Sequence, residues 1–494
     1  MFLTGLPRWA TFILLIASLV LFSLGITGFI VIPNIIGEKI SEQMRLVEDS
    51  PTLSRWANVS VPIYFSVYVF NVTNPSEFMA GEKPIVQEVG PFTFIQKRRK
   101  IIQNIDADSV NYLSWKSFIF HRELSSGSLD DMIYTLNIPL IAMDKLVSTK
   151  VPGDLGKSLL QPILEGLLDK HNEKLLVHRR VNQMLFEGYD VPMLTELAKL
   201  ATAFIPDAKF PASKRFGLLY NKNNTADQSF TVGTGAGKYP FTNILDWNNN
   251  TELEFWGNAD CNRINGTDGG QFPPFVRTSE RLYAFATDLC RSIYFEYEKP
   301  SDVNGLDTKR FTIPASMFAS GNQIEENRCF CEHPDKCREG GVINVSKCRR
   351  GAPLIMSAPH FYLGEDKLID EFEGLSPNKE KHETFLDVMT MTGLVLRAAK
   401  RLQINIDLKR SDLIYPLENI TDRIFPIAWI EELVEVPSKS TNLLQEKLVS
   451  PHKMGILVSS LASCAGAIGG IASILVFVVL QSNSSRTAKL YPVK

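Results

Sequence analysis

Two long apolar runs stand near the two ends of the 494-residue chain. Residues 9–32 and residues 455–480 contain no charged side chain. Each run is long enough to cross a bilayer core of about 30 Å as a helix. The first is longer than the roughly 7–15 apolar residues of a signal peptide and has no small-x-small cleavage site, so we interpret it as an uncleaved anchor.

The charges beside these runs predict the topology. Arg8 precedes the first run, and Arg486, Lys489 and Lys494 follow the second, with no acidic residue at either place. Positive flanks are typical of the cytoplasmic side. We therefore expect residues 1–8 and 481–494 to be cytoplasmic segments, and residues 33–454 to form one ectodomain outside the cell or in an organelle lumen.

Glycan acceptor sequences agree with this topology. Seven Asn-x-Ser/Thr matches lie between the two anchors, at Asn58, Asn71, Asn223, Asn249, Asn265, Asn344 and Asn419. An eighth match, Asn483, lies in the tail and is expected to stay unmodified.

Between the anchors, the pattern favours strands over helices. Runs rich in β-branched and aromatic residues predict strands at 61–70, 89–94, 109–121, 400–408 and 424–436. Helical periodicity predicts short helices at 36–48 and 441–453, on either side of this region. Many strands without an internal repeat indicate one large, mostly antiparallel ectodomain, for which closure into a barrel is one solution.

The clearest amphipathic helix is predicted at residues 154–176. Its apolar stripe, which is expected to face the core, is Leu155, Leu159, Leu160, Ile163, Leu164, Leu167 and Leu168. Pro162 is expected to kink this helix or split it in two. The opposite side and the following turn carry Lys157, Lys170, His171 and Lys174. A second helix is predicted at 191–204.

Six of the seven cysteines lie within residues 255–361. Clustered cysteines beside glycan acceptors indicate an oxidising compartment and a disulfide framework. Six cysteines allow fifteen pairings, and their spacing does not choose among them. The alternative is a metal site made by Cys329, Cys331, His333 and Cys337, although zinc prefers Cys-x2-4-Cys to the Cys-x-Cys spacing found here.

The remaining motifs exclude several function classes. A formal charge of −2 argues against a general polyanion binder, and no nucleic-acid partner is expected. The basic run at 97–100 is interpreted as a docking patch for an anionic ligand or as a solvated strand edge. The glycine-rich run 233–238 lacks the spacing of a phosphate loop. No hydrolase or zinc-protease motif appears, so neither an enzyme nor a cofactor is expected.

The chain resembles the class B scavenger receptor family, which includes fatty acid translocase, the high-density lipoprotein receptor and a lysosomal integral membrane protein, and we expect an invertebrate-type member. The similarity runs nearly end to end and is dense at residues 71–94, 255–275, 288–294, 351–365 and 382–408. The resemblance implies two transmembrane helices that bracket an α+β ectodomain with an antiparallel β-barrel core and a helical apical cap. It also implies the disulfides Cys261–Cys329, Cys290–Cys348 and Cys331–Cys337.

The resemblance further implies a function. Family members bind lipoproteins, fatty acids, sterols or carotenoids and pass lipid through an apolar tunnel, so Lys157, Lys170, His171 and Lys174 become candidate docking residues at the apex. The alternatives are a trafficking receptor for a protein cargo and a particle-scavenging or adhesion receptor. The tail has no acidic dileucine signal, which favours the plasma membrane over endosomes or lysosomes. Gly466-x-x-x-Gly470 permits close helix approach and hence a homo-oligomer.

Overall fold

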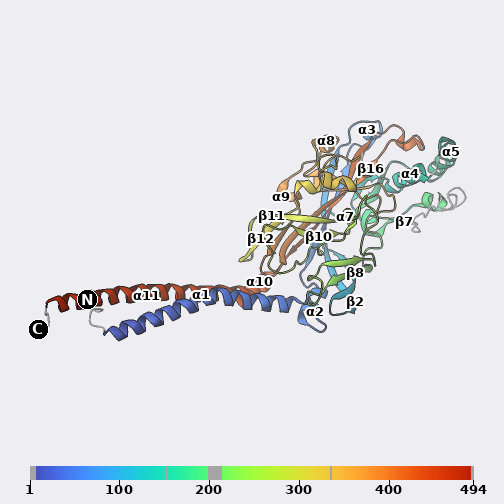
Figure 1. Ribbon diagram of the computed structural model, residues 1–494. Coiled ribbons are helices and arrows are strands. Elements are labelled where there is room, and N and C mark those ends of the chain that lie inside the picture. The colour runs from blue at the N-terminus through green and yellow to red at the C-terminus, as the bar shows by residue number, and fades with distance from the viewer. Residues whose placement is uncertain (1–6, 151–152, 198–213, 334–335, 491–494) are drawn as a thin grey trace. The chain divides into compact units, whose positions relative to one another are not determined.

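The computed structural model describes residues 7–150, 153–197, 214–333 and 336–490. The chain divides into two compact units. Residues 45–436 form the ectodomain unit, and residues 1–44 and 437–494 form the terminal unit. Figure 1 shows the ectodomain as a body of long strands, and the terminal unit as two long helices.

The helices have the following bounds: α1 Arg8–Met44, α2 Pro51–Ala57, α3 Pro75–Met79, α4 Ile138–Lys150, α5 Gly153–His171, α7 Ala259–Asn262, α8 Asp366–Asp370, α9 Lys379–His382, α10 Ser438–Leu444 and α11 Ser450–Leu490. The shorter helical turns are η1 Arg122–Leu124, η2 Gln183–Glu187, η3 Ala315–Met317, η4 Glu325–Phe330, η5 Pro359–Phe361, η6 Tyr415–Leu417 and η7 Gln445–Val449.

The strands have the following bounds: β1 Ile63–Val72, β2 Val86–Ile105, β3 Ser109–Phe120, β4 Met132–Leu136, β5 Leu176–Arg180, β6 Tyr189–Asp190, β7 Arg215–Phe216, β8 Thr225–Gly233, β9 Ile244–Trp247, β10 Leu282–Ala286, β11 Arg291–Val303, β12 Leu306–Thr312, β13 Val342–Asn344, β14 Leu354–Ser357, β15 Phe385–Met389, β16 Leu394–Leu408 and β17 Arg423–Glu435. Each strand predicted from the sequence lies within or overlaps one of these strands.

One large sheet organises the ectodomain. Its strand order is β10-β11-β12-β15-β16-β17-β1-β2-β3-β8-β9, with β13 and β14 added beside β16, and the paired strands are antiparallel. The first and last parts of the ectodomain therefore meet at the centre of the sheet, where β1 pairs with β17.

A short connection closes the gap between the two edge strands. Ile244 of β9 donates its backbone N–H to the carbonyl of Gly266, at 2.8 Å, and Thr267 exchanges backbone hydrogen bonds with Tyr283 and Phe285 of β10. A Cβ at Gly266 would lie 2.0 Å from the carbonyl oxygen of Tyr283, and its φ of +88° also favours glycine. The sheet is thus a nearly closed antiparallel barrel, and the predicted fold class is confirmed.

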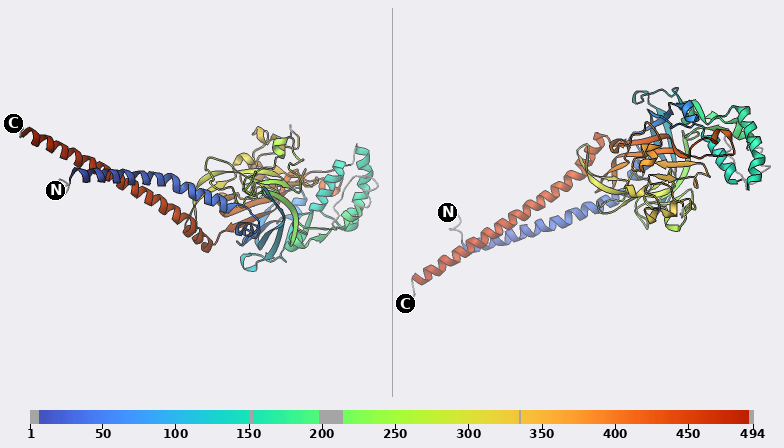
Figure 2. Two further views of the ribbon diagram at one scale, coloured as in Figure 1. Left: turned by 60° about the horizontal axis from the view of Figure 1, so that its bottom comes forward. Right: turned by 90° about the horizontal axis from the view of Figure 1, so that it is seen from above.

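Helices cover one end of this barrel. The segment β4–α4–α5–β5 lies there, and the backbone N–H of Tyr134 in β4 donates to the side chain of Asn71 near the end of β1. The teal helices α4 and α5 stand together at this end of the ectodomain (Figure 2). On α5, Leu160, Leu164 and Leu168 are buried in the main hydrophobic core.

Two details of α5 differ from the sequence prediction. The helix runs without a break through Pro162 and ends at His171, so it is not split in two. Leu159 and Ile163 are 66% and 36% exposed, so the apolar stripe is not wholly core-facing. The two residues are four positions apart and share one face, which leaves an exposed apolar pair on the cap. The side chain of Leu155 lies outside the described residues, as do residues 198–204 of the second predicted helix.

The terminal unit pairs the two apolar helices. α1 continues through Pro33 to Met44, so the predicted helix at 36–48 is an extension of the first anchor rather than a separate element. Both helices are long and apolar enough to cross a membrane. They pack antiparallel through small residues: a Cβ at Gly25 would meet Ser463, and one at Gly455 would meet Ile32. Cys464 is a free, exposed cysteine on α11.

This packing predicts a strong effect at Gly466. A Cβ there would lie 2.4 Å from the backbone nitrogen of Phe22, whereas a Cβ at Gly470 would be 4.0 Å from its nearest neighbour, Ser18. Gly466→Ala should therefore separate α1 from α11 and lower the stability of the helix pair by about 1–3 kcal/mol. This loss should reduce the amount of mature protein about twofold or more. Gly470→Ala is the matched control. Equal expression of the two variants would contradict this helix pairing, in which Gly466 lies against Phe22 of the same chain.

Candidate functional site

The register of the barrel divides its residues between an inner and an outer face. Phe65 of β1 pairs with Phe94 of β2 and with Glu432 of β17, and Arg98 of β2 pairs with Lys116 of β3. Paired and alternate residues share a face. Lys100 of β2 also bonds Asp268, which lies in the connection between β9 and β10. Because these strands are distant from β2 in the sheet, the contact crosses the barrel interior. This face is therefore the inner one.

On β16 and β17 several outward-facing side chains are more buried than their inward-facing neighbours, which is the reverse of the pattern in a filled barrel. Among the outward-facing residues, Gln403, Asn405 and Trp429 are buried. The segment from η5 to α9 covers Gln403 and Trp429, and β14 covers Asn405. Among the inward-facing residues, Leu402 and Ile430 are only half-buried. A filled interior would bury inner apolar side chains most completely. The inner face therefore borders open space in this part of the barrel.

One part of the interior is closed by aromatic rings. Phe65 contacts Phe94 and Phe118 edge to face, with ring centroids 6.4 and 4.8 Å apart. Phe186 of η2 packs against both Phe94 and Phe118, at 5.0 and 5.1 Å. These rings join the inner face of the barrel to the helical cap through one continuous apolar cluster.

A belt of charged side chains lines another part of the interior. Arg98 bonds Glu432 at 2.7 Å, Lys100 bonds Asp268 at 3.1 Å, and Lys400 contacts Asp288. Lys400 and Asp288 face inward yet keep 43% and 47% of their side-chain surface exposed, which again indicates space inside the barrel. Lys400 and neighbouring Lys116 hold the pKa of Asp288 below its usual range, against the opposing effect of burial. The belt is therefore ionised.

The basic run at 97–100 contributes to this belt, but not as the sequence suggested. It lies within β2, where its residues pair with β3, so it is not a solvated strand edge. Alternation turns Arg98 and Lys100 inward and Lys97 and Arg99 outward, where Arg99 lies over the ring of Trp115 at 4.8 Å. The four cations therefore do not form one docking patch.

The predicted apical docking residues are only partly brought together. Lys170 bonds both carboxylate oxygens of Glu196 at 2.8 Å, and His171 lies 3.2 Å from the same group. Lys174 is exposed just beyond the end of α5. Lys157 is more than three helical turns from Lys170, about 20 Å away along α5. Glu196, which the sequence analysis did not single out, neutralises part of the expected positive patch.

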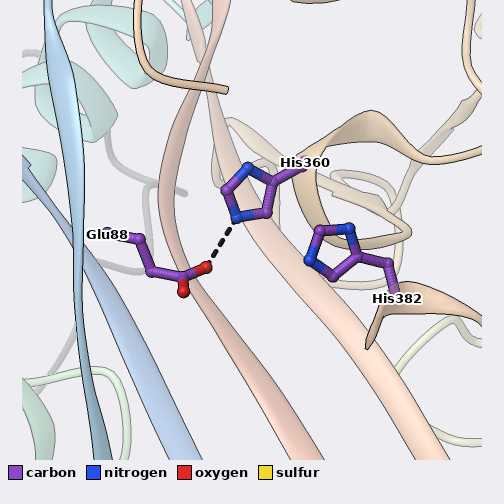
Figure 3. A group of neighbouring side chains, drawn as sticks. All are labelled: Glu88, His360 and His382. Atoms are coloured by element: carbon purple, nitrogen blue, oxygen red, sulfur yellow. Dashed lines mark hydrogen bonds and ion pairs between the residues drawn. The ribbon is translucent and has the colours of Figure 1, made fainter. Parts of the chain in front are cut away.

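A separate cluster lies on the outer face of the barrel. Glu88 of β2 points toward His360, and the ring of His382 lies beside that of His360 (Figure 3). One carboxylate oxygen of Glu88 accepts from His360 Nε2 at 2.6 Å and from Trp429 Nε1 at 2.7 Å. The two imidazoles stack with centroids 4.5 Å apart. The sequence offered no signal for this cluster, because its residues come from distant segments.

Backbone hydrogen bonds fix the tautomers of both histidines. The N–H groups of Ser376 and Asn378 donate to the Nδ1 atoms of His360 and His382, at 3.0 and 2.9 Å. Each Nδ1 is therefore an acceptor, and the proton of each neutral ring is on Nε2. A metal-binding histidine instead donates its second N–H to an acceptor. The donor set thus suits a hydrogen-bonded cluster better than a metal centre.

Burial keeps His382 neutral in the folded protein. Burial, followed by the nearby His360, lowers the pKa of His382 to about 4, whereas its unfolded value is near 6.5. The pKa of Glu88 is also lowered, because the hydrogen bonds from His360 and Trp429 outweigh the effect of burial. Protonation of His382 therefore opposes the folded state.

This predicts acid-dependent stability. The contribution of neutral His382 to the free energy of unfolding is complete above about pH 6.5 and is lost as the pH falls toward about 4, by about 3 kcal/mol in total. His382→Asn keeps an acceptor for the N–H of Asn378 and should flatten this loss, so its melting temperature should fall less between pH 7 and pH 5. His178→Asn, at an exposed histidine, is the control. If acid lowered the melting temperature of wild type and His382→Asn equally, His382 would not be the source of the acid sensitivity.

The structure joins the six clustered cysteines as Cys261–Cys329, Cys290–Cys348 and Cys331–Cys337, the pairs that the resemblance implies. Among the predicted glycan acceptors, Asn58, Asn223, Asn249 and Asn419 are exposed, and Asn71, Asn265 and Asn344 are half-buried. Occupancy of these sites stays a prediction.

Comparison with known proteins then decides the family. A model described as the CD36 family matches residues 14–478, which includes most of both terminal helices and the whole barrel. The chain belongs to the CD36 family. Together with the two terminal apolar helices, this membership makes the chain a two-pass membrane protein.

Curated members of the CD36 family cover most of the chain. Lysosome membrane protein 2 of Rattus norvegicus is 36% identical over 83% of this chain and 82% of its own length, and the Homo sapiens protein is 36% identical over 84% and 83%. Scavenger receptor class B member 1 of Rattus norvegicus is 32% identical over 90% and 84%. The chain is therefore similar both to lysosomal and to scavenger-receptor members of the CD36 family.

Proposed function

We propose that this chain is a cell-surface receptor that binds lipids or lipoproteins at the apex of its ectodomain and passes lipid through the barrel interior toward the membrane. The observation that carries the proposal is the reversed burial on β16 and β17, where the inward-facing Leu402 and Ile430 are more exposed than the outward-facing Trp429. Scavenger receptor class B member 1 is among the proteins similar to this chain.

The interior can serve transport without a catalytic group. Removing apolar surface from water contributes about 25 cal/mol per Å². A lipid that leaves water for the inner wall near Phe65, Leu402 and Ile430 therefore moves downhill and needs no nucleotide. The aromatic cluster connects this wall to the cap. The exposed apolar pair Leu159 and Ile163 on the cap supports a lipid entry surface there.

A second function is favoured by one observation. The lowered pKa of His382 predicts that the Glu88–His360–His382 cluster loses stability in acid, and lysosome membrane protein 2 is among the similar proteins. A trafficking receptor that releases its cargo at low pH would use such a cluster. It predicts binding that weakens below about pH 6.

Selective uptake tests the first function. Cells expressing the chain are offered lipoprotein particles that carry one label in the lipid and another in the particle protein. We expect lipid to enter in several-fold excess over particle protein. Equal entry of both labels would indicate particle uptake, and binding without entry would indicate docking or trafficking.

A further inference from the structure

Within the described part of the chain, one inward-facing cation beside the belt, Lys116, has no ion-pair partner. Arg98, Lys100 and Lys400 each have a carboxylate within ion-pair distance. Lys116 faces inward on β3 beside Arg98, and among the described residues it has neither an ion pair nor a side-chain hydrogen bond. Burial and the neighbouring Arg98 lower the pKa of Lys116, and Glu432 and Asp288 only partly oppose this effect. The ammonium group is therefore poorly compensated.

We propose that Lys116 binds the carboxylate of a long-chain fatty acid inside the barrel, so that the interior prefers anionic lipids over neutral ones of the same shape. The inference rests on the proposed lipid route and adds to it a specificity residue and a preference for negatively charged lipids.

The surroundings of Lys116 fit this ligand. Phe118 is the next inward-facing residue on β3, and it begins the aromatic cluster with Phe65 and Phe94. A carboxylate at Lys116 would therefore leave its chain beside an apolar wall. A charge-assisted hydrogen bond to a poorly compensated ammonium is stronger than a neutral one.

The neighbouring carboxylates restrict the charge of the ligand. Glu432 and Asp288 both act on Lys116 and are ionised through their own partners, Arg98 and Lys400. A ligand with a single negative charge gains from Lys116 with limited repulsion, whereas a doubly charged phosphate monoester would be repelled more strongly. A neutral ester or sterol gains nothing from the ammonium group.

The test uses purified full-length protein in lipid nanodiscs. The probes are a hexadecanoic acid with a photoreactive group in its tail and the methyl ester of the same acid, and covalent labelling of the ectodomain is measured for each. We expect the acid to label the wild-type ectodomain more strongly than the methyl ester does. Lys116→Met should reduce labelling by the acid about tenfold and leave labelling by the ester unchanged. Lys116→Arg should restore the preference.

Lys97→Met is the matched control, because Lys97 is exposed on the outer face of β2. If acid and ester both label wild type and Lys116→Met leaves their ratio unchanged, the role of Lys116 is overturned while the lipid route stands. If neither probe labels the wild-type ectodomain, the lipid route itself is overturned, and this inference with it.

Discussion

Leu402→Trp is expected to reduce lipid uptake about tenfold or more while leaving particle binding unchanged. Leu402 lies on β16 and faces the barrel interior, where it is only half-buried. A tryptophan there extends into the open space beside Ile430, its partner on β17. A barrier increase of about 1.4 kcal/mol lowers a rate tenfold, and overpacking of an interior costs about that much or more. Uptake is measured per receptor at the cell surface.

Two variants make this result interpretable. Ser114→Trp places the same side chain on the inner face of β3, opposite Lys100, and should block uptake independently. Ile119→Trp places it on the outer face of β3, where Ile119 is 50% exposed, and should have no effect. Uptake that survives both inward substitutions would mean that lipid does not pass through the barrel.

Asp387→Asn is expected to lower the free energy of unfolding of the ectodomain by about 3 kcal/mol. The carboxylate of Asp387 is fully buried on β15 and accepts two hydrogen bonds from Arg310 and one from Arg397, at 2.7–2.8 Å. Asparagine keeps the volume but removes the buried negative charge that the guanidinium groups of Arg310 and Arg397 share. The melting temperature and the yield of mature protein should both fall.

The pH dependence of this triad has a defined sign. Burial would raise the pKa of Asp387, but the hydrogen bonds from Arg310 and Arg397 lower it. The contribution of ionised Asp387 to the free energy of unfolding is therefore present above its unfolded pKa, near 3.9. It is lost as the pH falls through the lower pKa of the folded state. Glu296→Gln, which removes an exposed partner of Arg281, is the control and should cost less than 1 kcal/mol, as is typical of surface pairs. If Asp387→Asn also lowered the free energy of unfolding by less than 1 kcal/mol, the buried triad would not stabilise the ectodomain.

Local sequence patterns predicted much of the fold. The two uncharged runs at the ends predicted α1 and α11, and the β-branched and aromatic runs predicted β1, β3, β16 and β17. These predictions succeed because apolar length and strand periodicity are properties of neighbouring residues. Closure of the sheet was harder to derive, because it depends on hydrogen bonds of Gly266 and Thr267 to strands on both sides.

The site was less visible in the sequence because it depends on distant contacts. The run at 97–100 was noticed, but only the strand register shows that Arg98 and Lys100 turn into the barrel. Lys116 carried no signal, since its lack of a partner depends on the pairing of its neighbours. Glu196 and Glu88 were missed for the same reason, as both act on histidines far away in the chain.

The passage of lipid through the barrel interior is tested most directly by a photoreactive side chain inside it. A photoreactive amino acid is placed at position 402 on the inner face, or at position 119 on the outer face, in the full-length chain at the surface of cells supplied with lipoprotein. After irradiation, the lipid attached to the purified protein is measured. We expect attached lipid at position 402 and background at position 119. Equal, background-level labelling at both positions would contradict the passage of lipid through the barrel interior.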